Sequence, residues 1–84
     1  MELLVCITGN GNAVQPGHVI EAMPDGHAWS EAERSSPAWR IVRVDLTPVE
    51  ADALRVFGGS AIKLDLTGLP DQMTRVDLYA RAGL

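Results

Sequence analysis

The chain has 84 residues, 46% hydrophobic and 21% charged, which is typical of a folded globular domain and not of a disordered segment. Eleven Asp and Glu residues against seven Lys and Arg give a net charge of −4, and no stretch gathers the basic residues into the patch that binding to DNA or RNA requires. We therefore expect no direct contact with nucleic acid. A chain of this length has room for one thin core, so residues 1–84 are predicted to form a single domain.

Signals for membrane insertion and for disulfide bonding are both missing from the sequence. No segment approaches the roughly 18 apolar residues of a membrane span, and the N-terminus does not have the pattern of a signal peptide. The single cysteine, Cys6, lies in the apolar run Leu3–Ile7, which predicts a buried and unreactive thiol. These features favour a reducing, cytoplasmic setting and no membrane contact.

The first strand is predicted over Glu2–Thr8, where nearly every residue is apolar, as in a strand buried at the centre of a sheet. The glycine- and asparagine-rich run Gly9–Asn12 then predicts a loop. This order superficially resembles a dinucleotide-binding turn. Val14 stands where the third glycine should be, and no helix pattern follows, so we expect no nucleotide site.

A second strand is predicted over His18–Met23, and Pro24–Gly26 has the residues of a tight turn. His27–Trp29 fits a short strand, and Ser30–Arg34 fits either a polar loop or a single helical turn. The clearest strand pattern is Ala38–Asp45, whose expected neighbour in the sheet is the second strand. Trp39, Ile41 and Arg43 alternate with Arg40, Val42 and Val44, so both of its faces are partly apolar.

A helix is predicted from Thr47 to Phe57. Thr47 is a suitable N-cap, Pro48 suits the first helical position, and Glu50 completes a capping box. The pair Gly58-Gly59 is the expected stop.

Strict alternation over Ala61–Leu66 predicts a half-exposed strand, with Ile62, Leu64 and Leu66 facing inward. Gln72–Ala82 fits both a strand and a helix, and its strand-favouring residues make us prefer the strand. The resulting fold class is α+β: a small antiparallel sheet of four to five strands with one short helix. A partly closed, SH3-like barrel is one form that such a sheet can take.

Several residue types that carry chemistry are present without the spacing that the chemistry needs. His18 and His27 flank the predicted chain reversal near Asp25, Glu21 and Glu31, but no pair has the tight spacing of metal ligands. No serine lies in a nucleophile-elbow sequence, and so short a chain leaves little room for a catalytic pocket. We therefore predict no metal, no cofactor and no enzymatic activity.

The two tryptophans have different expected roles. Trp39 is predicted to be a principal core residue. Trp29 has two interpretations, as a core residue or as an exposed anchor for a partner, because tryptophan is enriched at interface hot spots. Beside Trp29, the residues that would face a partner in a docked assembly are His27, Glu31, Arg40 and Arg43.

One family resemblance spans residues 17–51. The runs GHVIEAMPDGHAWSEAE (17–33), WRIVRV (39–44) and LTPVEA (46–51) resemble small proteins encoded among the virion-structure genes of tailed bacteriophages and prophages. Those proteins have the pattern G-x-V-[IV]-x-x-x-P-D-G-x-x-W-[GS]-x-x-E, followed by an apolar strand and a Pro-Glu helix start.

The resemblance implies a setting and no catalytic residues. The expected function is that of a non-enzymatic virion accessory protein: head decoration, minor capsid or head–tail connector. Its partners would be capsid, portal or neck proteins, and its location the virion or the host cytoplasm. We also expect homo-oligomers, because a thin core gains from burial in an interface. The alternative is a small acidic regulatory protein that inhibits a host protein complex.

Overall fold

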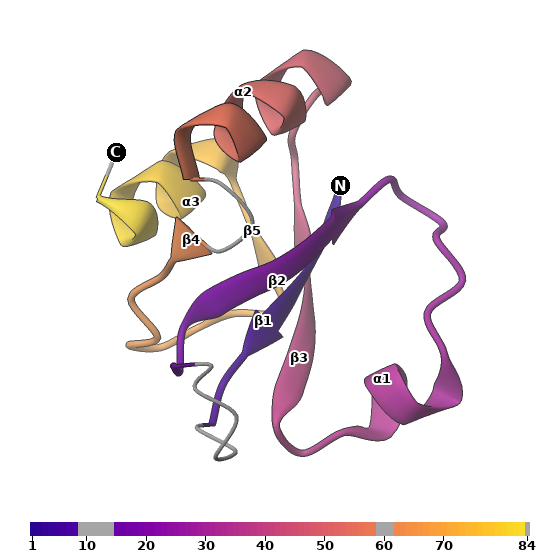
Figure 1. Cartoon of the computed structure of the whole chain (residues 1–84). Helices are drawn as coiled ribbons and strands as arrows, with labels where there is room; N and C mark the ends of the chain where they lie inside the picture. Colours follow the sequence, from indigo (N-terminus) through magenta and orange to yellow (C-terminus); the bar gives the residue numbers. More distant parts are fainter. Residues whose placement is uncertain (9–14, 59–61, 84) are drawn as a thin grey trace.

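A curled five-stranded sheet, half of a barrel, is the frame of the protein (Figure 1). The computed structural model describes residues 1–8, 15–58 and 62–83, with 54–58 as backbone only. The strands are β1 (Glu2–Cys6), β2 (His18–Met23), β3 (Trp39–Val44), β4 (Ile62–Lys63) and β5 (Gln72–Met73), and the helices are α1 (Glu31–Ser35), α2 (Pro48–Gly58) and α3 (Arg75–Ala82). The predicted small α+β fold is confirmed, with three helices described where the sequence predicted one.

The strand β1 lies at the centre of the sheet, as its apolar sequence predicts. The order is β4-β2-β1-β3-β5, and β1 is antiparallel to both of its neighbours. From Leu3 to Cys6 its residues are 0% to 3% exposed. The prediction that β3 pairs with β2 is wrong, because β1 lies between them. A strand that is apolar on both faces is best covered in this central place.

One strand departs from the expected antiparallel arrangement. The strand β5 pairs with β3 in parallel, whereas β4 is antiparallel to β2. A parallel neighbour requires a long crossover, and the chain between β3 and β5 supplies it with α2 and β4. The sheet is therefore mixed.

A β-bulge in β2 decides which of its side chains face the core. Leu4 is paired with Glu21 but Val5 with Val19, so Ile20 is an extra residue opposite β1. Val19 and Ala22 consequently both face the core although they are three positions apart. Ile20 and Glu21, adjacent in sequence, are left for the opposite face.

The core fills the face of the sheet that α2 and α3 cover at one end, and α1 lies at the other end beside β3 (Figure 1). The buried core cluster is Leu3, Val5, Val19, Val42, Val44, Leu46, Leu64, Met73 and Leu78. Burial of Val42 and Val44 confirms the predicted alternation of β3. The prediction for Trp39 is wrong, because it is half-buried and lies outside this cluster.

The preferred strand over Gln72–Ala82 is wrong beyond Met73, because the chain forms α3 there. The Thr74 hydroxyl accepts a hydrogen bond from the Asp77 N–H, which caps the first turn, and Gly83 at φ 73° ends the helix in the left-handed conformation. Leu78 is fully buried, whereas Val76 is 69% exposed. Capping and burial of Leu78 outweigh the strand-favouring residues of this segment.

The side chain of Arg81 joins α3 to the segment after β4. Its Nη1 donates to the carbonyl oxygens of Asp65 (2.9 Å) and Thr67 (2.8 Å), and its Nη2 donates to that of Gly68 (3.2 Å). One guanidinium thus provides hydrogen bonds to three backbone carbonyls that are not paired within the sheet.

The predicted start of α2 is confirmed. The Glu50 N–H donates to Thr47 Oγ1 and the Thr47 N–H donates to Glu50 Oε1, each at 3.2 Å, which is a complete capping box. The helix reaches Gly58, and Gly59 of the predicted stop lies outside the described residues.

The remaining predictions concern loops and short elements. Ser30–Arg34 contributes to the short helix α1, one of the two forms that its sequence allowed, but His27–Trp29 forms no strand. The strand predicted over Ala61–Leu66 is described only as β4, although Leu64 is buried and Lys63 and Asp65 are exposed as the alternation predicts. Gly9–Asn12 lies outside the described residues.

Among the residues that the structure describes, no helix is both long and apolar enough to span a membrane.

Candidate functional site

The candidate site lies on the face of the sheet opposite the core, which we call the outer face. Leu4 and Cys6 of β1 are buried but do not belong to the core cluster, as expected for side chains that alternate with Leu3 and Val5. Across β1 and β3, Leu4 is paired with Ile41 and Cys6 with Trp39. The outer face is therefore apolar along its middle.

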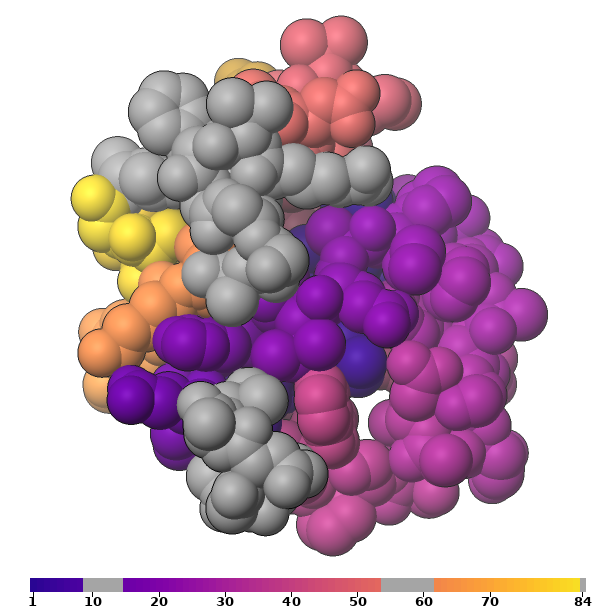
Figure 2. Space-filling view, in the orientation of Figure 1, coloured from indigo at the N-terminus to yellow at the C-terminus, as the bar shows by residue number. Residues whose placement is uncertain are grey.

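Residues 24–38, between β2 and β3, cover only part of the outer face. They turn away from β2 at Pro24, where the His27 N–H donates to the Pro24 carbonyl (3.2 Å) and Gly26 has φ 81°, so the predicted turn is confirmed. The chain then reaches α1, which packs beside β3. In the space-filling view the molecule is hollowed between β2 and this segment (Figure 2).

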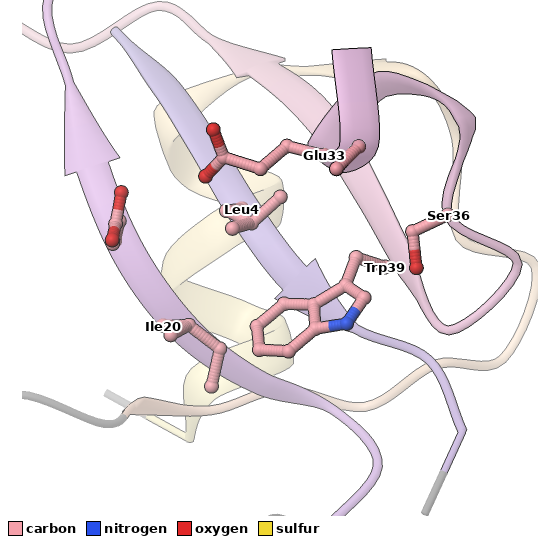
Figure 3. Close-up of a pocket in the computed structure, with 7 residues that line it drawn as sticks. Leu4, Ile20, Glu33, Ser36 and Trp39 are labelled. Carbon is pink, nitrogen blue, oxygen red and sulfur yellow. The ribbon is translucent and has the colours of Figure 1, made fainter. Parts of the chain in front are cut away.

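The hollow is a cleft of about 410 Å³. Its walls come from β1, β2, β3, α1 and the residue that follows α1 (Figure 3). The lining residues are Leu4, Ile20, Glu21, Ala32, Glu33, Ser36 and Trp39. Because of the bulge in β2, this strand contributes both an apolar side chain, Ile20, and a carboxylate, Glu21.

The floor of the cleft is apolar and its rim is acidic. Figure 3 shows the Trp39 ring beside Ile20, with the Glu33 carboxylate reaching from α1 toward Leu4. Trp39 is half-buried and Glu21 is exposed. Among the described residues neither Glu21 nor Glu33 forms an ion pair. The lining set contains two carboxylates and no basic side chain.

Glu33 is held in place by the capping box of α1. The Ser30 N–H donates to Glu33 Oε1 (3.0 Å), and the Glu33 N–H donates to Ser30 Oγ (3.1 Å). The hydrogen bonds from the Ser30 backbone and hydroxyl hold the pKa of the Glu33 carboxyl below its ordinary value. Glu33 is therefore negatively charged at neutral pH.

Replacing Ser30 with alanine is expected to lower the free energy of unfolding by about 1 kcal/mol, because it removes the side chain that caps α1. Ser30→Asp keeps an acceptor at the N-cap and should stay within roughly 0.5 kcal/mol of the parent. Urea unfolding followed by tryptophan fluorescence measures both variants. Equal stability of Ser30→Ala and the parent would mean that the cap does not order α1.

The structure does not present Trp29 as an exposed anchor, so that interpretation is wrong. Trp29 is 6% exposed, and its Nε1 is buried with no hydrogen-bond partner among the described residues. The His27 ring contacts it edge-on, with centroids 4.6 Å apart and planes at 78°. Trp39, assigned to the core from the sequence, is the tryptophan that lines the cleft.

The other partner-facing candidates do not converge on one surface. Glu31 is exposed at the start of α1 but does not line the cleft. Arg40 is exposed, yet its Nη1 donates to the Leu69 carbonyl (2.8 Å) and its Nε lies 3.3 Å from Asp71 Oδ1, so it holds the loop before β5. Arg43 is exposed and, three positions along β3, lies by alternation on the opposite face from Arg40.

The residues weighed for metal or thiol chemistry are dispersed. His18 begins β2 and His27 follows the turn at its other end, so they do not meet. Within residues 1–8, 15–58 and 62–83, no three His, Cys, Asp or Glu side chains are grouped so that they could hold a metal ion. Cys6 is fully buried, as predicted, and its Sγ donates to the Thr8 carbonyl (2.9 Å).

The sequence does not predict most of the cleft: Leu4, Ile20 and Ala32 have the pattern of ordinary apolar residues, and Glu21 was considered only as a metal ligand. The one available signal was that both faces of the first and third strands are apolar, which implies an outer face in need of cover. Comparison with protein-family models, curated proteins and solved structures gave no significant match.

Proposed function

We propose that this chain is a non-enzymatic accessory protein of a phage virion, which binds a capsid, portal or neck protein through the cleft on its outer face. The observation that carries the proposal is the half-buried Trp39, which lies beside Ile20 on a sheet face that residues 24–38 leave partly open. Tryptophan in such a setting offers a large contact area at little cost in conformational entropy. The resemblance of residues 17–51 to small virion-module proteins supports the phage setting.

The cleft is suited to anchoring one side chain of a larger partner. Its volume of about 410 Å³ is near the lower end of the range for small-molecule pockets, roughly 300–1,000 Å³. An anchor that enters such a pocket, surrounded by looser contacts that exclude water, is the usual arrangement of an interface hot spot. We expect Trp39 to be the main contributor on this side of the interface.

Quantitative mass spectrometry of purified particles from the phage or induced prophage that encodes the chain tests this function. We expect the chain in a fixed ratio to the major capsid protein, which would place it on the lattice, or at about a dozen copies, as at a symmetric portal or neck ring. A particle that lacks the chain would overturn the virion proposal.

A charge-reversal variant tests whether the cleft is needed to incorporate the chain into the particle. Glu21→Lys places a positive charge at the rim, and we expect its copy number per particle to fall severalfold. Asp45→Lys is the matched control, because Asp45 is exposed and outside the cleft lining. If both variants are incorporated like the parent, another surface makes the contact.

A second candidate, inhibition of a host protein complex, is favoured by the acidic rim of the same cleft. Two carboxylates without ion-pair partners among the described residues suit a basic protein surface. Absence from the particle, together with specific co-purification of a host protein that Glu21→Lys abolishes, would support this candidate.

A further inference from the structure

The cleft combines two features, and few chemical groups on a ligand can contact both of them favourably. Its floor is apolar and includes an indole face, whereas its rim has carboxylates from β2 and α1, Glu21 and Glu33. An apolar partner side chain would leave both carboxylates desolvated without a cation, which is unfavourable. A small anion would be repelled.

We propose that the cleft binds an arginine side chain of the partner protein, with its aliphatic stem on Ile20 and Leu4 and its guanidinium between the Trp39 ring and the carboxylates of Glu21 and Glu33. This inference rests on the proposed function, since it names the chemistry of the partner at the same cleft. It commits the partner to an exposed arginine at the centre of the interface.

Charge complementarity is the first argument. Three of the chain's arginines are bound to other groups: Arg40 to Leu69 and Asp71, Arg75 to Glu50, and Arg81 to three carbonyls. Among the described residues neither rim carboxylate has an ion-pair partner, and only His27 contributes an electrostatic effect to the lowered pKa of the Glu33 carboxyl. With a net charge of −4, the chain also attracts a basic partner over a distance.

The second argument is that Glu33 is already fixed in position. Its Oε1 accepts the Ser30 N–H at 3.0 Å, which ties the carboxylate to the first turn of α1. A carboxylate held by a capping box loses less side-chain entropy when it receives a cation than a free one does.

The third argument distinguishes arginine from lysine. A planar guanidinium stacks on an aromatic ring and donates to carboxylates from a fixed fork at the same time. The side chains around this cleft provide both kinds of contact, the Trp39 ring on the floor and the carboxylates on the rim (Figure 3). A lysine ammonium is more strongly hydrated and would use the indole face less well.

NMR titration of the labelled chain with N-acetyl-arginine amide tests the proposal, and N-acetyl-citrulline amide is the neutral ligand of matching shape. We expect the Trp39 indole N–H signal to shift and saturate with arginine, with citrulline at least about tenfold weaker. Trp29 is an internal control, because its buried Nε1 lies outside the cleft lining and should not shift. Equal binding of citrulline or of N-acetyl-lysine amide, or no saturable shift at Trp39, would overturn the proposal.

Variants of the two rim glutamates test whether their charges are responsible for arginine binding. Glu21→Gln with Glu33→Gln should weaken arginine binding at least about tenfold, and glutamine at position 33 keeps the capping box of α1. Asp45→Asn should bind like the parent. Unchanged binding by the double variant would contradict the assignment.

Two further outcomes separate this inference from others. A Trp39 signal that shifts with protein concentration alone would mean that a second copy of the chain occupies the cleft, and the arginine assignment would then be wrong. The titration uses isolated protein and does not depend on particle composition. A chain that binds arginine but is absent from virions therefore refutes the phage setting alone, and a virion protein that does not bind arginine refutes this inference alone.

Discussion

Replacing Gly17 with alanine is expected to lower the free energy of unfolding by about 2–5 kcal/mol, because two penalties act at one position. Gly17 has φ 87°, a conformation that alanine adopts only under strain. A Cβ at this position would also overlap the backbone carbonyl oxygen of Leu64, which cannot move aside like a side chain. The loss should be visible as a lower urea midpoint at an unchanged slope.

The reason for this sensitivity is that Gly17 joins two parts of the sheet. Its N–H donates to the Cys6 carbonyl at the end of β1, and its carbonyl accepts the Leu64 N–H just after β4. Any displacement that relieves the overlap with Leu64 must therefore break one of these backbone hydrogen bonds. We expect the β2–β4 pairing to be lost first.

Gly26→Ala is the matched control for Gly17→Ala. Gly26 has nearly the same φ, 81°, but a Cβ there would meet nothing within 4 Å. Its alanine variant should therefore lose only the conformational part, about 1–2 kcal/mol. If the two variants lose the same stability, the close approach of Leu64 contributes nothing, and the argument from packing fails.

Elements with local signals were predictable from the sequence. The apolar run of β1 indicated a central strand, the alternation of β3 indicated a strand with two partly apolar faces, and the Thr-Pro-x-Glu sequence marked the start of α2. Each of these depends on neighbours within a few positions. Local periodicity and capping chemistry are enough to define them.

Features that depend on distant contacts could not be predicted in this way. The neighbour of β3 is set by competition among strands, and the parallel pairing of β5 depends on the path of the whole crossover. The bulge that places Ile20 beside Glu21 in the cleft depends on the register between β1 and β2. For this reason the elements were largely foreseen and the cleft was not.

The exchanged roles of the two tryptophans have the same cause. Trp39 is in a strand with an apolar pattern, and Trp29 is flanked by polar residues, so local sequence favours burial of Trp39. Residues 24–38 fold back so that Trp29 is buried against the His27 ring, and they leave Trp39 at the edge of the cover. Which aromatic is covered follows from the tertiary path of this segment.

Leu78→Ala is expected to cost about 2–5 kcal/mol of stability, because Leu78 is the fully buried side chain by which α3 enters the core. In a chain of 84 residues the total stability expected from size is only roughly 4–13 kcal/mol, so this one change removes a large share of it. The neighbouring side chains cannot fill the space, since Tyr79 and Ala82 are already packed at the border of the core.

Loss of Leu78 should also release contacts that α3 carries at its ends. Arg75 Nη1 lies 3.2 Å from Glu50 Oε2 of α2, and Arg81 holds the carbonyls after β4, so a displaced α3 weakens both. Val76→Ala on the same helix is the control: Val76 is 69% exposed, and its change should stay within about 0.5 kcal/mol. Hydrogen exchange would show the amides of α3 losing protection in Leu78→Ala while those of β1 keep most of theirs. A variant that loses protection uniformly would mean that α3 and the sheet unfold only together, and that the thin core has no part that survives without Leu78.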